Sequence, residues 1–188
     1  MVLPTTRADG APARPPDPVI RDIAGKISTP EGYRVEILEG VIVVSPPPLV
    51  RHAAIASRLA RAVTTDAIEL VSAVTVRDER TGDDLVPDVL ATSTEALARD
   101  AGTIPPDLVL LVAEIVGPLG GAVDRVTKAS RYALSGIPLC LLVEPAKRRT
   151  TLYSHPEDGE YLTLHRVPFG HRLPLPDPFG VDLDTGEF

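Results

Sequence analysis

An almost uninterrupted apolar run at residues 108–116 limits the folds open to this chain more than any other feature. The run reads Leu-Val-Leu-Leu-Val-Ala-Glu-Ile-Val, and Glu114 is its single polar member. Such a run is typical of a strand that is covered on both faces. A glycine-rich hinge, a helical pattern at 122–135 and a second apolar run at 138–143 follow it. This order predicts a βαβ unit with two parallel strands and a right-handed crossover.

Two carboxylates interrupt apolar strands in this part of the sequence. Glu114 lies in the run above, and Asp88 lies in a shorter run at 85–90, directly after Pro87. A buried, unpaired carboxylate costs several kcal/mol or keeps its proton, so each needs a metal ion, a cation or a second acid nearby. Because proline donates no backbone hydrogen bond, we expect the strand of Asp88 to lie near a sheet edge or to carry a bulge there, which would leave its carboxylate accessible.

The remaining patterns predict one domain of mixed α/β class. Residues 1–18 are rich in proline and are expected to form a flexible tail before a single domain at 19–188. The patterns within that domain predict a hairpin at 33–44, a helix at 49–68, a strand at 70–76, a short helix at 94–101 and, after the βαβ unit, a meander that begins with a hairpin at 147–164.

Composition narrows the classes of function. The formal net charge of −7 argues against a broad basic surface for gripping nucleic acid, although acidic metal-binding residues also contribute to a negative count. No apolar run approaches the roughly 20 residues that span a bilayer, so we expect no membrane partner. The single cysteine, Cys140, lies in an apolar run and cannot form an internal disulfide. These features predict a soluble protein of the reducing cytoplasm.

A lysine lies near the two acids in the sequence. Hydrolysis of a phosphodiester commonly needs a hard cation such as Mg²⁺, held by one or two carboxylates, and a lysine that neutralises developing charge or orients the attacking water. Lys128 lies one helical turn after Asp124 and one turn before Tyr132, so the three share a helix face. An exposed ion pair between Asp124 and Lys128 explains the same spacing, and the spacing does not choose between the two.

Two further polar residues are candidates for supporting roles. Glu36 lies between apolar neighbours in the first strand of the predicted hairpin, where a solvent-facing position on an alternating edge strand is the simpler explanation. His52 lies in the first turn of the next helix, where histidines more often cap or pack than catalyse, although imidazole titrates in the useful range.

Together these motifs resemble those of the Uma2 family, also called DUF820, of restriction-endonuclease-like proteins. The resemblance covers roughly residues 33–183. The residues that carry it are Pro87-Asp88, Glu114-Ile115-Val116, Asp124, Lys128, Tyr132 and Gly136, with Glu36, Gly40, Ser45-Pro46 and His52 upstream.

The resemblance implies the PD-(D/E)XK nuclease superfamily and its restriction-endonuclease-like core, a mixed central β-sheet flanked by helices. By this analogy Asp88, Glu114 and the backbone carbonyl of Ile115 would hold Mg²⁺, with Mn²⁺ as a substitute. The sequence departs from the superfamily pattern at Val116, where the motif lysine is expected. The family takes that lysine from the following helix, which here means Lys128.

The sequence therefore predicts a Mg²⁺-dependent endonuclease that cuts DNA. Asp88, Glu114 and Lys128 would form its catalytic site, with Glu36, His52, Asp124 and Tyr132 in support. A homodimer is expected because both strands of a duplex need cutting. Two alternatives stay open: a binding or regulatory module that keeps the nuclease fold without turnover, and a structural subunit in which Lys128 points into solvent far from both acids.

Overall fold

The computed structural model describes residues 17–117 and 122–188, and for residues 122–126 it describes the backbone only. Its largest sheet has the strand order β11-β10-β9-β8-β6-β3. These strands are β3 (Ile68–Val71), β6 (Val89–Ser93), β8 (Val109–Ile115), β9 (Leu139–Glu144), β10 (Arg149–Glu157) and β11 (Glu160–Pro168). β8 and β9 are parallel, and α4 (Ala122–Leu134) connects them, so the predicted βαβ unit is confirmed.

A second, five-stranded sheet lies beside the first and has the order β2-β1-β5-β4-β7. Its strands are β1 (Arg34–Leu38), β2 (Val41–Ser45), β4 (Thr75–Arg77), β5 (Asp84–Leu85) and β7 (Thr103–Ile104). β1 and β2 form the hairpin that the sequence predicts, with Glu39 and Gly40 both at positive φ in its turn. A small pair, β12 (Arg172–Leu175) and β13 (Val181–Asp184), completes the strands of the described residues.

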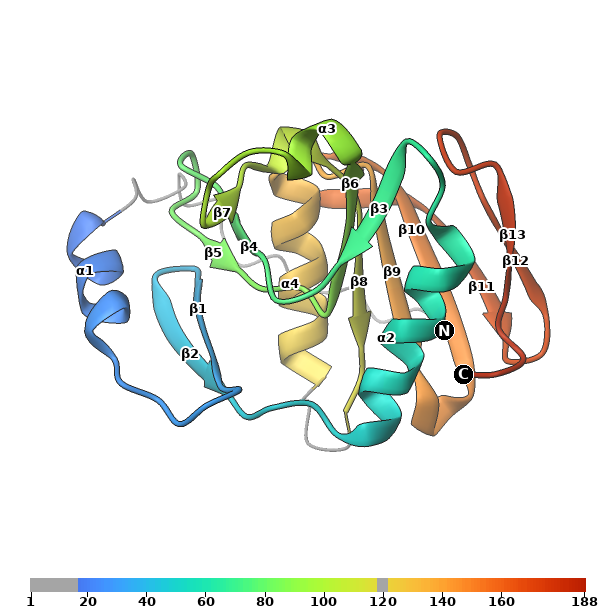
Figure 1. Ribbon diagram of the computed structural model, residues 1–188, viewed down its shortest axis with the longest axis horizontal. Helices are drawn as coiled ribbons and strands as arrows, with labels where there is room; N and C mark the ends of the chain where they lie inside the picture. Colours follow the sequence, from blue (N-terminus) through green and yellow to red (C-terminus); the bar gives the residue numbers. More distant parts are fainter. Residues whose placement is uncertain (1–16, 118–121) are drawn as a thin grey trace, which may run out of the picture.

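Helices cover both faces of the six-stranded sheet (Figure 1). α2 (Val50–Val63) packs Ile55, Leu59 and Val63 on one face, in a core cluster that β12 and β13 also enter. α4 packs on the opposite face, where Tyr132 joins a second cluster with residues of β4, β5 and β9. The remaining helices are α1 (Pro18–Lys26), α3 (Thr94–Leu97) and the 3₁₀ turns η1 (Pro106–Leu108) and η2 (Pro145–Lys147).

The chain changes sheets at two places where the sequence predicts continuous strands. The run at 85–90 divides into β5 and β6, and residues 86–88 carry the chain from the smaller sheet to the larger one. Pro87, which has no backbone N–H to donate, therefore lies outside the strand hydrogen bonds of both sheets. The predicted strand at 70–76 also divides, into β3 and β4, and Ala73 adopts a φ of 60° at the break.

The strand that follows Asp88 lies near a sheet edge, as predicted. β6 is separated from the edge only by β3. Its register shift lies between Ala91 and Thr92 rather than at Asp88. The carboxylate instead belongs to the connection that precedes the strand, because Pro87 ends the pairing before Asp88.

Several boundaries are shorter or earlier than the patterns predict. α2 ends at Val63 instead of 68, because Thr65 turns the chain and its hydroxyl accepts the amide of Ile68 at the start of β3. α3 begins after its Ser93 cap as expected but ends at Leu97. α1 begins at Pro18, within the predicted tail, and residues 1–16 lie outside the described part. Within the described residues, no helix combines the length and the apolar character that a bilayer crossing requires.

Candidate active site

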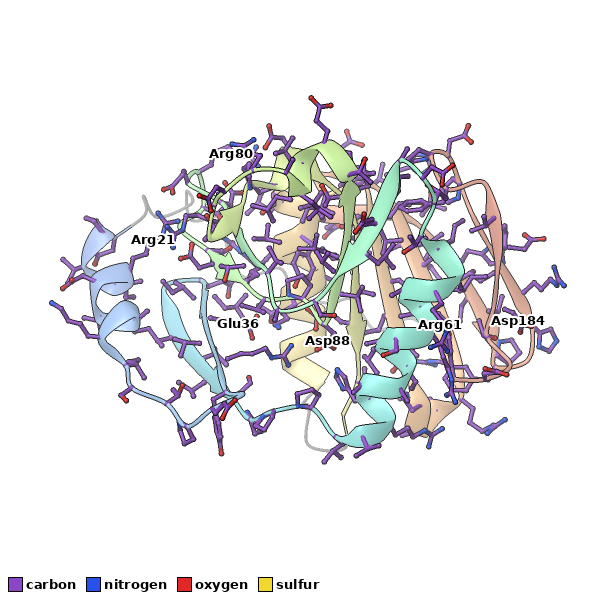
Figure 2. The ribbon with its side chains drawn as sticks, viewed as in Figure 1. Arg21, Glu36, Arg61, Arg80, Asp88 and Asp184 are labelled. Carbon is purple, nitrogen blue, oxygen red and sulfur yellow. The ribbon has the colours of Figure 1, made fainter. Side chains whose placement is uncertain are left out.

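The predicted site residues converge where the smaller sheet meets the C-terminal end of β8. Figure 2 shows Glu36 and Asp88 between the β1–β2 hairpin and the larger sheet. The elements that contribute are β1 (Glu36), the β5–β6 connection (Asp88), β8 (Glu114), α2 (His52) and α4 (Lys128 and Tyr132). Residues that are up to 96 positions apart in the chain, from 36 to 132, therefore contribute to one cluster.

Asp88 lies at the centre of one half of the cluster. Its Oδ2 accepts the backbone N–H of Ile115 at 2.7 Å, which fixes the carboxylate against the end of β8. Its Oδ1 lies 2.7 Å from an Nη atom of Arg34 and 2.9 Å from Nε2 of His52. Burial alone would raise the pKa of Asp88, but His52, the Ile115 amide and Arg34 together lower it below its ordinary value, so the group is a stable anion.

Glu114 lies in a different electrostatic environment. Its Oε1 accepts the hydroxyl of Tyr132 at 2.6 Å and lies 3.5 Å from Nζ of Lys128. Burial raises the pKa of Glu114 to about 7, with contributions from Asp88 and Glu36, although Lys128 and Tyr132 oppose the rise. Glu114 is therefore a carboxyl that changes its charge near neutral pH while its neighbour Asp88 stays ionised.

Lys128 connects Glu114 to Glu36. Its Nζ lies 2.7 Å from Oε1 of Glu36, and the lysine is only 6% exposed. The same Glu36 oxygen accepts the N–H of Val86 at 2.8 Å, in the connection that leads to Asp88. This carboxylate therefore fixes both the lysine and the loop that carries the first acid.

Tyr132 is fully buried and holds Glu114 in place. Burial, together with the nearby carboxylates, raises the pKa of the Tyr132 phenol well above its ordinary value. The phenol therefore stays protonated, and its O–H donates a hydrogen bond to Glu114. Its place one turn beyond Lys128 on α4 directs both side chains toward the end of β8.

The donor set fits Mg²⁺ better than a cation that needs three or more protein side chains. Among the described residues, no group of three or more His, Cys, Asp and Glu side chains is arranged to hold a metal ion. Mg²⁺ usually takes only one or two carboxylates and completes its shell with water and substrate phosphates. Asp88 and Glu114 would supply two hard oxygen ligands, and a carboxyl whose pKa is raised to about 7, as burial does for Glu114, fits a place where positive charge is favourable.

The expected exposure is wrong for Asp88 and for Glu36. The Asp88 side chain is 4% exposed, because Arg34, His52 and the end of β8 surround it, so its carboxylate is not accessible as predicted. Glu36 does not face solvent on an edge strand, since it is 2% exposed and paired with Lys128. β1 lies between β2 and β5 and is no edge strand, and its Glu36 contacts Lys128 of α4 and the N–H of Val86. Lys128 is likewise buried, which excludes the solvent-facing lysine of the structural-subunit alternative. The side chain of Asp124 lies outside the described residues, so its pairing stays a prediction, as does the role of the Ile115 carbonyl.

Arg34 also belongs to this cluster, although the sequence patterns do not predict it. This residue lies two positions before Glu36 on β1, and alternate residues of a strand share a face. Its side chain is 23% exposed, more than those of Asp88, Glu36, Lys128, Glu114 and His52. Once Glu36 is taken as a site residue, this spacing is the signal that identifies Arg34 as a second one.

Comparison with known proteins gives a family and a fold. The Uma2 family model, described as "Putative restriction endonuclease", matches residues 24–186. A solved structure, described as a "putative nuclease belonging to DUF820 from Anabaena variabilis", superposes with a TM-score of 0.69 over 89% of this chain and 95% of that one, at 17% identity. The fold is therefore the mixed α/β fold of that structure. Comparison with curated proteins gives no match.

Proposed function

Because this chain belongs to the Uma2 family, we propose that it is a metal-dependent endonuclease that hydrolyses phosphodiester bonds of DNA. Asp88 and Glu114 would hold Mg²⁺, and Lys128 would act on the phosphate or on the attacking water. The observation that carries the proposal is the junction of two acids of different pKa with one buried lysine at the end of β8. When bound, Mg²⁺ polarises the phosphate and makes water a better nucleophile at neutral pH.

Each residue of the candidate site has a role in this proposal. Asp88 offers a permanent negative charge, because its pKa is held low. Glu114 offers a second charge above about pH 7, and Tyr132 fixes its orientation. The ammonium of Lys128 would stabilise the charge that develops on the phosphate oxygens, while Glu36, 2.7 Å from its Nζ, would fix its position. His52 adds positive charge beside Asp88 when it is protonated.

The test is cleavage of supercoiled plasmid and of single-stranded DNA with Mg²⁺, with Mn²⁺ and with EDTA. Asp88→Asn and Lys128→Met should each lower the rate by about a hundredfold or more, the usual cost of losing a charge-stabilising group. Asp182→Asn is the matched control, because it removes a carboxylate from an exposed position on β13. Activity that survives in EDTA, or equal rates in all four proteins, would refute the proposal.

A binding or regulatory module is the second candidate, because Arg34 and Lys128 already form ion pairs with the carboxylates of Asp88 and Glu36. Metal titration separates the two functions. Bound ligand raises stability by RT ln(1 + [L]/Kd), so a working metal site makes the melting temperature depend on Mg²⁺ concentration. A module that has lost this chemistry shows no such dependence and no cleavage.

A further inference from the structure

We propose that Arg34 is the substrate-positioning arginine of the site, which holds Asp88 until metal binds and then pairs with the scissile phosphate. This inference rests on the proposed function, since it assigns a further residue to the same reaction. It is motivated by the contacts of Arg34, by its place at the exposed side of the cluster and by its chemistry.

The contacts of Asp88 place Arg34 where a metal would compete. Asp88 Oδ2 is occupied by the Ile115 amide, which is part of the backbone and cannot leave without disturbing β8. Oδ1 is therefore the oxygen open to a metal, and Arg34 and His52 now lie against it at 2.7 and 2.9 Å. A guanidinium keeps its charge at all ordinary pH values, so it repels a divalent cation bound to the same oxygen. Arg34 must then find another partner.

The surroundings of Arg34 favour a phosphate as that partner. Its side chain is 23% exposed, whereas the side chains of Asp88 and Glu36 are 4% and 2% exposed, so the guanidinium lies on the side from which a substrate can enter. Its Nε is buried and has no hydrogen-bond partner among the described residues, and the contact with the Val86 carbonyl is long, at 3.5 Å. A guanidinium with unused donors binds phosphate oxygens through two parallel hydrogen bonds.

If Arg34 moves from Asp88 to the phosphate when metal binds, one substitution should have opposite effects on the affinities for Mg²⁺ and for DNA. Arg34→Gln removes the cation that competes for Asp88, so the Kd for Mg²⁺ alone should fall about three- to tenfold. The same change removes a phosphate contact, so the Kd for a short DNA duplex should rise about tenfold or more. An arginine that only stabilises the fold cannot produce this pair of effects.

The experiment measures both affinities in four proteins. Calorimetry gives the Kd for Mg²⁺ alone, and fluorescence anisotropy gives the Kd for a labelled duplex in Ca²⁺, which also takes oxygen ligands. Arg34→Lys keeps the charge but not the planar fork, so its Mg²⁺ affinity should stay near wild type while duplex binding weakens. Arg172→Gln is the control, because it removes an exposed guanidinium on β12, far from β1 in Figure 1. Both of its affinities should stay within about twofold of wild type, because salt screens distant surface charges.

Each outcome decides the role of Arg34. Unchanged or weaker Mg²⁺ binding in Arg34→Gln overturns the proposed role of Arg34. The proposal also fails if Arg172→Gln loses as much duplex affinity as Arg34→Gln. If Arg34→Gln fails to fold, Arg34→Lys decides alone, and duplex binding equal to wild type overturns the proposal. If the Arg34 variants show both predicted changes in affinity but the wild-type protein cuts no DNA, the proposed nuclease activity is refuted and the role of Arg34 in binding stands. If the wild-type protein cuts DNA but the Arg34 variants bind Mg²⁺ and duplex as tightly as wild type, only the proposed role of Arg34 is refuted.

Discussion

At the scale of single residues, the two acids of the site differ because their hydrogen-bond donors differ. Asp88 accepts from the backbone amide of Ile115 and lies beside Arg34 and His52, so its pKa falls despite burial. Glu114 accepts a neutral phenol and has a more distant lysine, so burial prevails and its pKa rises to about 7. A pair of carboxyl groups separated in this way is a common feature of acid–base and metal sites.

The raised pKa of Glu114 predicts how the stability of the metal-free protein depends on pH. The folded protein binds this proton more tightly than the unfolded chain, whose glutamates titrate near about 4.3. The contribution of Glu114 to stability is therefore complete below about pH 4 and is lost as pH rises through about 7. Glu114→Gln, which cannot ionise, should be more stable than wild type at pH 8 by on the order of 3 kcal/mol and nearly equal to it at pH 4.

Urea unfolding in EDTA at the two pH values measures this difference. Tyr132 can still donate to the amide oxygen of the glutamine, so the substitution leaves that contact in place. An advantage of the variant that is the same at both pH values would show that packing, not ionisation, causes it.

The pair formed by Lys128 and Glu36 predicts strong energetic coupling. Lys128→Met alone leaves Glu36, which is 2% exposed, as a buried charge without its cation, and should cost roughly 3–5 kcal/mol of stability. In the double variant with Glu36→Gln, neither charge remains, so the loss should be smaller than the sum of the single losses by about 1 kcal/mol or more. Denaturant unfolding of all four proteins closes the cycle, and additive losses would contradict direct coupling.

At the scale of elements, ion pairs attach α4 to the smaller sheet. Arg131 of α4 lies 2.5 Å from Asp83, which precedes β5 and is 1% exposed. The other oxygen of Asp83 accepts the N–H of Glu39 at 2.8 Å, in the turn of the β1–β2 hairpin. One carboxylate thereby joins the helix that carries Lys128 to the hairpin that carries Glu36.

This connection predicts unequal costs for two similar substitutions. Arg131→Met leaves Asp83 buried without its cation and should destabilise the protein by roughly 3 kcal/mol. Lys26→Met also removes one member of an ion pair, but Lys26 and Asp22 are 73% and 62% exposed, so its cost should stay below about 0.5 kcal/mol. Thermal and urea unfolding compare the two variants. Equal costs would mean that the Arg131 pair contributes no more than a surface pair.

The sequence predicts the elements better than it predicts where they separate. The apolar run with Glu114, the glycine-rich hinge and the helix of Lys128 identify the βαβ unit, because hydrophobic pattern and turn residues agree there. The pattern at 85–90 does not reveal that the chain changes sheets, because both halves are apolar and buried. Pro87 marks the break, but its effect depends on which strands lie beside it.

The site shows the same division between local and tertiary information. Asp88 and Glu114 stand out because a charge inside an apolar strand is costly, whereas Glu36 occurs in a pattern that equally fits an edge strand. Its burial follows from contacts with Lys128 and Val86, which lie 92 and 50 positions further along the chain. Arg34 escapes prediction for the same reason, since only the tertiary fold brings β1 to Asp88.

At the scale of the whole molecule, the charge balance shapes how such an enzyme would meet DNA. The chain has 19 Lys and Arg residues against 26 Asp and Glu, and several arginines of the described part are already paired with buried carboxylates. A protein of this kind has few cations left to neutralise phosphates along a duplex. Binding would then depend on the divalent cation at the site and on the side chains around it, Arg34 and Lys128.

This balance predicts weak salt dependence and a strong requirement for metal. Duplex binding should be undetectable in EDTA and should appear with Ca²⁺, and the slope of log K against log[salt] should stay shallower than about −4, which corresponds to roughly four phosphate contacts. Fluorescence anisotropy between about 50 and 200 mM NaCl measures the slope. A basic face that grips the backbone would instead give binding in EDTA and a slope steeper than about −6. Asp88→Asn distinguishes the two sources of affinity, since it should abolish the Ca²⁺-dependent binding and leave any binding to a basic face intact.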